Sequence, residues 1–307
     1  MCGRYVLVRI EVPGGYIHTR VWVGQEEFQD KDWFKKKISE IRARYDIRPT
    51  QDIVIMKVDA KTKKLSMPPA TWTVRAEIFD KESQTMKKVT AINARQEKLL
   101  SWNLWRSALK HHRCIIPASA FYEWQARKDA PKNVPWEIRR KGYENFYFAG
   151  VCVEAKHHKT GEDVFETAII TQPGNSLMKW LHNHGGNFGR QPVFLDDDKI
   201  DRWLDPELKD AKEAESLLRR IEEGEWEAKI LRNIGDDTEH TPPVAYEWAE
   251  FITKPDKSIK LEIPQKESKP KKIIKKVAKP LKPKEKKPAK ESSKKTPKRA
   301  AVRGRAN

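Results

Sequence analysis

Cys2 has the clearest chemical potential of any residue in the sequence, because it directly follows the initiator Met1. Cysteine is small enough for the initiator methionine to be removed, so we expect Cys2 to become the N-terminal residue. It then carries an α-amine that titrates near about pH 8 beside a thiol with a pKa of about 8.5. Such a 1,2-aminothiol can attack an aldehyde through the amine and close a thiazolidine ring through the thiol. Judged by position alone, an ordinary small residue is the simpler interpretation.

Three further motifs carry polar side chains suited to holding a ligand or moving a proton. Taken singly, each also has a structural interpretation: a helix cap for the asparagine, a solvated strand position for the glutamate and a structural role for the histidine. In chain order the motifs are Asn93-Ala94-Arg95, Phe121-Tyr122-Glu123-Trp124, and His182-Asn183 followed by Arg190-Gln191-Pro192-Val193.

Together with Cys2 and the segment Arg113-Cys114-Ile115-Ile116-Pro117-Ala118, these motifs stand in the order found in the SRAP family, the SOS-response-associated "peptidases". The sequence resembles that family over roughly residues 2 to 235. The resemblance implies a protein that senses abasic sites in single-stranded DNA and forms a thiazolidine DNA–protein crosslink through its N-terminal cysteine. It implies neither a metal nor an organic cofactor. A ring-opened abasic sugar is an aldehyde, the electrophile that an aminothiol suits.

The resemblance also implies a catalytic set of Cys2, Asn93, Glu123 and His182. Cys2 would be the nucleophile through both its amine and its thiol. Asn93 would hold the free N-terminus by amide hydrogen bonds. Glu123, next to aromatic residues, would have a raised pKa and exchange a proton with the amine or imine. His182 would act as acid–base in opening the sugar ring.

Arg4, Arg95 and Arg190 match the family's basic positions near the lesion and would bind flanking phosphates. The alternative for each is a surface arginine paired with a carboxylate. Trp72 matches a family tryptophan that would support a base by stacking, and a core tryptophan is its alternative. We therefore expect a DNA-binding set of Arg4, Arg95, Arg190 and Trp72.

The sequence departs from the family pattern in three segments. The usual Trp-Gly-Leu-Ile-Pro is replaced at residues 72–76 by Trp-Thr-Val-Arg-Ala, and the usual Arg-Met-Pro at residues 190–192 by Arg-Gln-Pro. The family places its histidine about two residues before that arginine, whereas His182 precedes Arg190 by eight. Residues 183–189 therefore resemble an inserted glycine-rich loop that touches DNA or gates the cleft. His184 within it competes with His182 for the acid–base role.

The chain has 62 Lys and Arg against 44 Asp and Glu, a formal charge of +18, but this charge is unevenly spread. Residues 253–307 contain 21 basic and 5 acidic residues, a net of +16, so the first 252 residues are nearly neutral. We expect residues 253–307, rich in Lys, Pro and Ala, to be a disordered tail that contacts nucleic acid without reading its sequence.

Residues 2–252 are expected to form a single α+β domain, because short strand-like runs outnumber helical ones and their connections are short. The family implies a largely antiparallel, barrel-like β core with flanking helices. Helical spacing is found from residue 30 to Tyr45 and from Arg95 to Leu109, and a β-branched run covers Asp52–Val58. Shorter helices are expected at Asn175–Leu181, Lys199–Leu204 and Asp210–Glu222, and strands at the ranges 3–10, 114–116, 121–124, 135–138, 146–153 and 165–171.

The remaining cysteines, Cys114 and Cys152, lie in apolar runs and are expected in the core. Three cysteines form no disulfide framework and no Cys-x-x-Cys metal pair, which favours a reducing compartment. No run approaches the roughly 18 apolar residues of a membrane span. We expect a monomer in the cytoplasm associated with the nucleoid, or in the nucleus of a eukaryote.

Two other functions fit parts of the same sequence. A thiol peptidase or hydrolase would use Cys2 with His182. A non-enzymatic DNA-binding protein would act through the basic tail alone.

Overall fold

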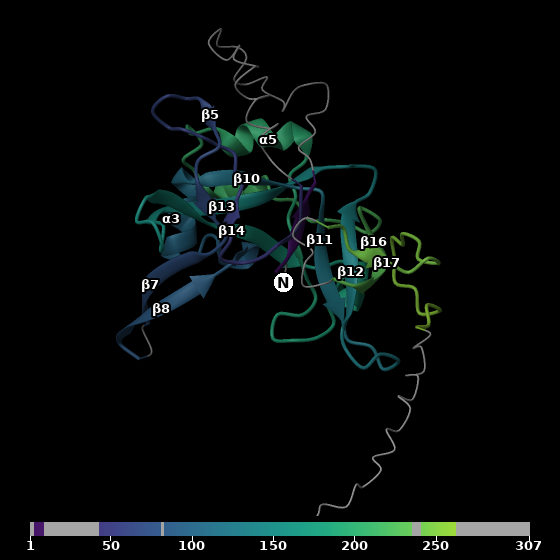
Figure 1. Cartoon of the computed structure of the whole chain (residues 1–307). Coiled ribbons are helices and arrows are strands. Elements are labelled where there is room, and N and C mark those ends of the chain that lie inside the picture. Colours follow the sequence, from purple (N-terminus) through teal and green to yellow (C-terminus); the bar gives the residue numbers. More distant parts are fainter. Residues whose placement is uncertain (1–2, 9–42, 81–82, 235–240, 262–307) are drawn as a thin grey trace, which may run out of the picture. The chain divides into compact units, whose positions relative to one another are not determined.

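The structure is a computed structural model that describes residues 3–8, 43–80, 83–234 and 241–261 (Figure 1). The chain divides into two units after Ile263, and every described residue belongs to the first.

The first large sheet has six strands, each paired with its neighbours in antiparallel fashion. Its last long strand shows why these segments form strands: Trp226, Ala228 and Ile230 are buried, while the residues between them are half-exposed. In spatial order the strands are β17 (Val244–Ala245), β16 (Trp226–Asn233), β12 (Val134–Arg140), β11 (Ala120–Gln125), β1 (Tyr5–Leu7) and β2 (Arg44–Ile47).

The second large sheet is centred on β14 (Asp163–Pro173), which pairs with four other strands. The long apolar β13 (Phe146–Lys156) lies between β10 (Arg113–Ala118) and β14. A Cβ on Gly150 in β13 would lie 2.8 Å from the Cys114 sulfur, so the close approach of β10 requires glycine there. The other strands are β10 (Arg113–Ala118), β13 (Phe146–Lys156), β6 (Ala70–Thr71), β3 (Asp52–Ile53), β9 (Asn93–Arg95) and β15 (Arg190–Pro192), of which β6 and β9 run parallel to β14.

Aromatic side chains from both large sheets fill the space between them. Phe121 of the first sheet packs edge-on against Phe148 of the second, with ring centroids 6.1 Å apart. Trp226 contacts both Phe121 and Phe146, with centroids 5.1 and 5.4 Å apart. Such edge-to-face pairs add about 0.5–1.5 kcal/mol each beyond burial of their area, so this cluster joins the two sheets into one core.

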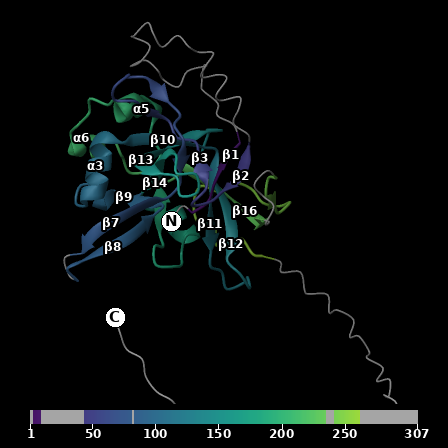
Figure 2. The same cartoon turned by 60° about the vertical axis from the view of Figure 1, so that its left-hand side comes forward.

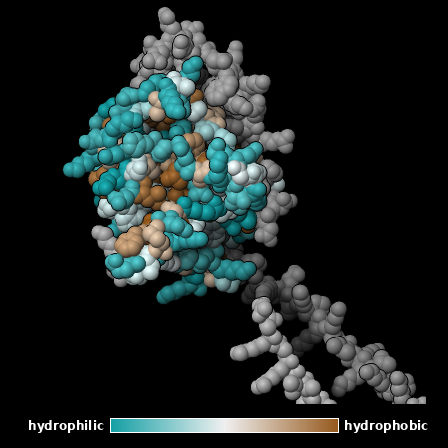
Figure 3. Space-filling view, turned by 90° about the vertical axis from the view of Figure 1, so that its left-hand side faces the viewer, coloured by the Kyte–Doolittle hydropathy of each residue, from teal (hydrophilic) through white to brown (hydrophobic). Residues whose placement is uncertain are grey.

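Two smaller hairpins and a few short helices complete the unit. The hairpin of β7 (Val74–Asp80) and β8 (Thr85–Ala91) extends away from the large sheets in both Figure 1 and Figure 2. The side on which this hairpin and α3 (Asn103–His111) lie is mainly hydrophilic, with an apolar area in its middle (Figure 3). The remaining elements are β4 (Lys57–Val58), β5 (Leu65–Ser66), the 3-10 helix η3 (Gln96–Lys98), α3 (Asn103–His111), α4 (Ser176–Leu181), α5 (Asp197–Leu204) and α6 (Ala211–Ser216).

The expected α+β class with a largely antiparallel, curled β core and few helices is confirmed. Among the described residues, no helix is long and apolar enough to span a membrane. The described part of the chain likewise contains no cluster of three or more His, Cys, Asp or Glu that could hold a metal.

Several local predictions need correction. The expected helix from Arg95 to Leu109 is a strand, a 3-10 turn and then α3, because residues 93–95 pair with β14. The β-branched run at 52–58 is split between β3 and β4. Tyr45, expected at the end of a helix, lies in β2, and residues 30–42 of that prediction lie outside the described residues.

The described body also continues past residue 252, where the basic tail was expected to begin. Ile259 accepts a hydrogen bond from Arg127 at 2.6 Å, and the Leu261 backbone N–H contacts Asp129 at 3.3 Å. Both apolar side chains pack partly buried against the core. Residues up to 261 therefore belong with the body, and residues 262–307 lie outside the described residues.

Candidate functional site

Glu123 lies on the inner face of β11. The side chains of a strand alternate between its two faces, so Glu123 shares a face with Phe121 of the main core, whereas Tyr122 belongs to a separate cluster on the other face. Only 4% of Glu123 is exposed. Burial raises the pKa of its carboxyl to about 8, because a buried carboxylate loses the hydration that stabilises its charge. The predicted raised pKa is confirmed, and its cause is tertiary burial.

His182 lies at the C-terminal end of α4, where its backbone N–H donates to the Met178 carbonyl at 2.8 Å. Its side chain is buried, and burial lowers the pKa of the imidazole to about 4. Its Nδ1 lies 4.0 Å from Oε1 of Glu123, beyond hydrogen-bond distance and close enough for both to face one reacting group.

Two contacts between β11 and the end of α4 bring Glu123 and His182 together. Gln125, two residues after Glu123, donates its side-chain amide to the Trp180 carbonyl at 3.0 Å. The side chain of Asn183 makes a reciprocal pair with the backbone of Ala126, at 2.9 and 3.0 Å. Sequence reasoning missed both residues as site supports; the adjacency of Asn183 to His182 was the available signal.

The inverted pKa values define what this pair can do near pH 7. Glu123, with a pKa of about 8, is mostly protonated and can donate a proton. His182, with a pKa of about 4, is neutral and can accept one. A carboxyl normally has a lower pKa than an imidazole, and here the environments reverse that order. The two neighbouring groups can therefore serve as an acid and a base in one site.

Asn93 is buried in β9, with Ile169 of β14 as its parallel partner. This position rules out the helix-cap alternative, since Asn93 begins a strand. The same β14 continues into the turn before α4, so the two elements that carry Asn93 and His182 share one support.

Cys2 lies outside the described residues. The first residue described, Gly3, leads into β1, which pairs with β11. The Tyr122 N–H donates to the Arg4 carbonyl at 3.0 Å, so the described chain begins beside the strand that carries Glu123.

The predicted DNA-contacting arginines have different surroundings. Arg4 is partly exposed, lies 3.4 Å from a carboxylate oxygen of Asp46 and stacks over Trp124 at 5.0 Å. Arg95 is exposed and donates to the side chain of Asn187 in the glycine-rich loop.

Arg190 is buried, and its guanidinium donates to both carboxylate oxygens of Glu97 at 2.7 and 2.8 Å. It also donates to the Thr171 carbonyl at 2.8 Å, and its hydrogen bonds hold the pKa of Glu97 below the ordinary value. This geometry matches the carboxylate-paired alternative for Arg190, although the pair is more buried than expected of a surface residue. Glu97 was not singled out from the sequence, because nothing local marks a partner 93 residues away.

Trp72 requires a correction. It is fully buried, its indole N–H donates to the Ile92 carbonyl at 2.8 Å, and its ring packs edge-on against Tyr5 at 5.3 Å. Neither ring face is available to a base, so Trp72 is a core residue here. The replaced segment after it starts the β7–β8 hairpin instead of the family's turn.

Cys114 and Cys152 are fully buried core residues, as predicted. Burial raises the pKa of the Cys114 thiol well above its usual value, which disfavours the reactive thiolate.

His184 contacts the side chain of Asn133. Its Nε2 lies 2.7 Å from the Asn133 side-chain amide nitrogen, and its ring centroid is 6.5 Å from that of His182. His182, with its Nδ1 4.0 Å from Oε1 of Glu123, is therefore the better candidate for the acid–base role.

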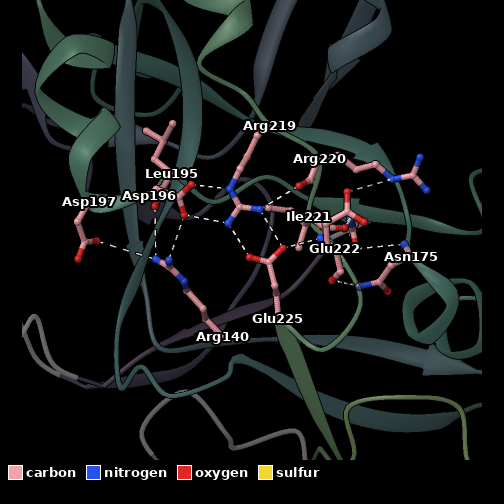
Figure 4. Close-up of polar contacts among 11 residues, drawn as sticks. Arg140, Asn175, Leu195, Asp196, Asp197, Arg219, Arg220, Ile221, Glu222 and Glu225 are labelled. Atoms are coloured by element: carbon pink, nitrogen blue, oxygen red, sulfur yellow. Dashed lines mark hydrogen bonds and ion pairs between the residues drawn. The ribbon is translucent and has the colours of Figure 1, made fainter.

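A chain of polar contacts leads from Arg219 to Asn175, the residue that precedes α4 (Figure 4). Arg219 bridges Asp196 and Glu225, and Glu225 accepts the backbone N–H of Glu222. The Glu222 carbonyl in turn accepts from Asn175 at 2.9 Å. Asn175 also caps α4 by accepting the Met178 N–H at 3.0 Å, so this chain fixes the helix whose other end carries His182.

Asn175→Ala is expected to lower the free energy of unfolding by about 1–3 kcal/mol, because it removes the helix cap and the partly buried hydrogen bond to the Glu222 carbonyl. Urea unfolding measures the change. Asn175→Asp keeps the cap and should recover part of the loss. Lys179→Ala, at an exposed position of the same helix, should change stability by less than about 0.5 kcal/mol. Wild-type stability in Asn175→Ala would show that this support is unimportant.

Comparison with known proteins gives consistent matches. Residues 1–234 match the family described as SOS response associated peptidase (SRAP). The chain is 30% identical over 210 residues to abasic site processing protein YoqW of Bacillus subtilis, covering 66% of this chain and 85% of that protein. It is 26% identical over 182 residues to abasic site processing protein HMCES of Gallus gallus, covering 53% of this chain and 52% of that one.

A solved structure from Bacteroides thetaiotaomicron has the same fold, with a TM-score of 0.57 and 20% identity over 79% of this chain and all of that one. The family match covers most of the chain and includes the strands and helix that carry Asn93, Glu123 and His182. On this evidence the chain belongs to the SOS response associated peptidase (SRAP) family.

Proposed function

We propose that this protein processes abasic sites in single-stranded DNA by forming a thiazolidine crosslink through Cys2 after removal of Met1. The observation that carries the proposal is the buried Glu123–His182 pair, 4.0 Å apart, because Glu123 lies on β11, the strand that pairs with the N-terminal strand β1. The relatives named abasic site processing proteins support the substrate class.

Ring opening of the abasic sugar is the first step. Neutral His182 takes the proton of the C1′ hydroxyl while the bond between C1′ and the ring oxygen breaks. The ring oxygen then receives that proton back from His182, which leaves an aldehyde at C1′ and a neutral imidazole. The lowered pKa of His182 keeps it available as the base near pH 7.

Crosslinking consumes the aldehyde and releases one water. The Cys2 amine adds to C1′ to give a carbinolamine, and protonated Glu123 donates its proton to the departing hydroxyl, which leaves an iminium. The Glu123 carboxylate then accepts the thiol proton as the sulfur bonds to C1′ and closes the five-membered ring. Buried Asn93 would hold the amine through its side-chain amide.

The exposed Arg95 and partly exposed Arg4 are proposed to bind the flanking phosphates. Arg95 would exchange its bond to Asn187 for a phosphate oxygen. Buried Arg190 is instead proposed to hold β15 in place through Glu97 and Thr171.

A gel assay tests the proposed function. Wild-type protein is incubated with single-stranded DNA that carries one abasic site and is then heated in denaturant. A heat-stable, slower-migrating adduct is expected. The same oligonucleotide reduced with borohydride, which converts the aldehyde to an alcohol, should give none. An equal yield with reduced or undamaged DNA would contradict aldehyde chemistry.

The basic residues 262–307 are proposed to raise local contact with DNA without reading it. Deletion of residues 262–307, which spares the contacts made by Ile259 and Leu261, should preserve crosslinking at saturating DNA. Initial binding should weaken, and the slope of log affinity against log salt should become shallower by about 0.7 for each lost phosphate contact. Binding titrations at several salt concentrations measure both effects. Loss of all crosslinking, or an unchanged slope, would contradict this division of roles.

A further inference from the structure

The glycine-rich loop of residues 183–189 is a closely bonded turn. Gly185 and Gly189 have positive φ angles of 81° and 65°, which other residues rarely adopt. The Gly189 N–H donates to the His182 carbonyl at 2.6 Å, and the Gly189 carbonyl accepts from Gly174 at 2.8 Å. The loop therefore returns to the residue from which it starts.

Side chains along the loop attach it to three neighbouring parts of the body. Asn183 bonds to the backbone of Ala126, His184 contacts Asn133, and Asn187 accepts from Arg95. These partners lie just after β11, in the turn before β12 and at the end of β9, so the loop is held from several sides.

Phe188 is the exception within this anchored loop. Its side chain is 66% exposed, the largest value among the large apolar residues that the structure describes as exposed. Its backbone N–H donates to the Gly185 carbonyl at 3.3 Å, which fixes the position from which the ring projects. An aromatic ring that projects from a bonded loop keeps its apolar face in water, so this face is available to a flat apolar ligand.

Phe188 also lies next to the groups proposed to act on DNA. It is covalently joined to Gly189, which bonds to the His182 carbonyl, and to Asn187, which bonds to Arg95. Another exposed aromatic, Phe79, pairs with Met86 at the far end of the β7–β8 hairpin. Trp72 is buried and presents no face to a base.

We propose that Phe188 is a stacking platform for the nucleobase adjacent to the abasic site. This inference rests on the proposed function. An abasic nucleotide leaves its neighbouring base without a stacking partner on one side, and an aromatic side chain can occupy that face. Stacking of one base on an aromatic residue changes affinity by about 5- to 150-fold, and it tolerates any base because each has a π face.

A double-substitution cycle tests the contact. The probes are single-stranded oligonucleotides with a tetrahydrofuran in place of the abasic sugar, which bind without crosslinking. Each probe is compared with a second probe in which one neighbouring base is also replaced by tetrahydrofuran. One series removes the base on the 5′ side of the lesion, and the other series removes the base on the 3′ side. For the wild type, base removal on one side should weaken binding about 5- to 150-fold.

In Phe188→Ala the same base removal should change affinity less than twofold, because the partner ring is gone. Phe188→Tyr should restore the wild-type dependence, and Phe188→Leu should not. Phe79→Ala, which removes an aromatic that is 54% exposed elsewhere on the surface, should behave as wild type. If, in both the 5′ and the 3′ series, removal of the base weakens DNA binding by Phe188→Ala as much as binding by the wild type, the stacking proposal is wrong.

The readout also separates this inference from the proposed function. With a true abasic site, Phe79→Ala should need the wild-type DNA concentration to reach half of its maximal crosslink yield, whereas Phe188→Ala should need about 5- to 150-fold more DNA, because the lost stacking weakens binding. Absence of an adduct in the wild type would contradict the proposed function, while the tetrahydrofuran cycle would still decide whether Phe188 stacks.

Discussion

Cys2→Ser is expected to abolish the heat-stable adduct with abasic single-stranded DNA. The serine amine can still form an imine, but a hydroxyl at its ordinary pKa supplies no nucleophile comparable to a thiolate to close a stable ring. The imine alone hydrolyses during heating. Gel analysis of adduct yield against time measures the effect, which should be a loss to background.

Two arms separate the roles of the amine and the thiol. Addition of borohydride during the reaction should trap the imine of Cys2→Ser as a stable adduct, which shows that the amine still reacts. Cys152→Ser is the matched control: this buried thiol donates to the His112 carbonyl at 3.3 Å, a bond that serine can replace. Its adduct yield should match wild type. A heat-stable adduct of Cys2→Ser formed without borohydride would disprove the thiazolidine mechanism.

Glu123→Gln is expected to slow crosslinking by about 10²- to 10⁴-fold near pH 7, the usual effect of losing a general acid. With a pKa of about 8, Glu123 is protonated below that pH and ionised above it. The wild-type rate should therefore rise as the Cys2 amine becomes neutral and fall as pH passes about 8. The falling limb due to Glu123 should be missing in the variant. Single-turnover rates from pH 5 to 10 measure both changes.

Thermal unfolding distinguishes this chemical effect from misfolding. Because burial raises the pKa of Glu123 from 4.5 to about 8, the group's contribution to stability is complete below about 4.5 and is lost as pH rises through 8. Glu123→Gln should therefore unfold at a higher temperature than wild type at pH 9.

Glu137→Gln is the matched control for the rate measurements. Glu137 is a buried carboxylate opposite Tyr122 on the neighbouring strand, and its replacement should leave the wild-type pH profile of crosslinking unchanged. A Glu123→Gln rate and pH profile equal to wild type would remove Glu123 from the mechanism.

Much of the fold was predictable because strand-forming runs are local. The apolar segments that became β10, β11, β13 and β14 were recognisable from residue type, and so was the core position of Cys114 and Cys152. The strand β16 was missed although its alternation is clear in the sequence. The helix predicted from Arg95 onwards was wrong at its start. Residues 93–95 pair with β14 as a strand, and this pairing outweighs the local helix propensity.

The sequence by itself determined the family and the candidate residues Cys2, Asn93, Glu123 and His182, because the order of short motifs is a property of the chain alone. Tertiary structure decided which side chains meet and how they titrate. The Glu123 pKa depends on burial by strands distant in sequence, Arg190 is paired with Glu97, and Trp72 is buried while Phe188 is exposed. Desolvation and pairing depend on neighbours in space, and local residue patterns do not encode those distances.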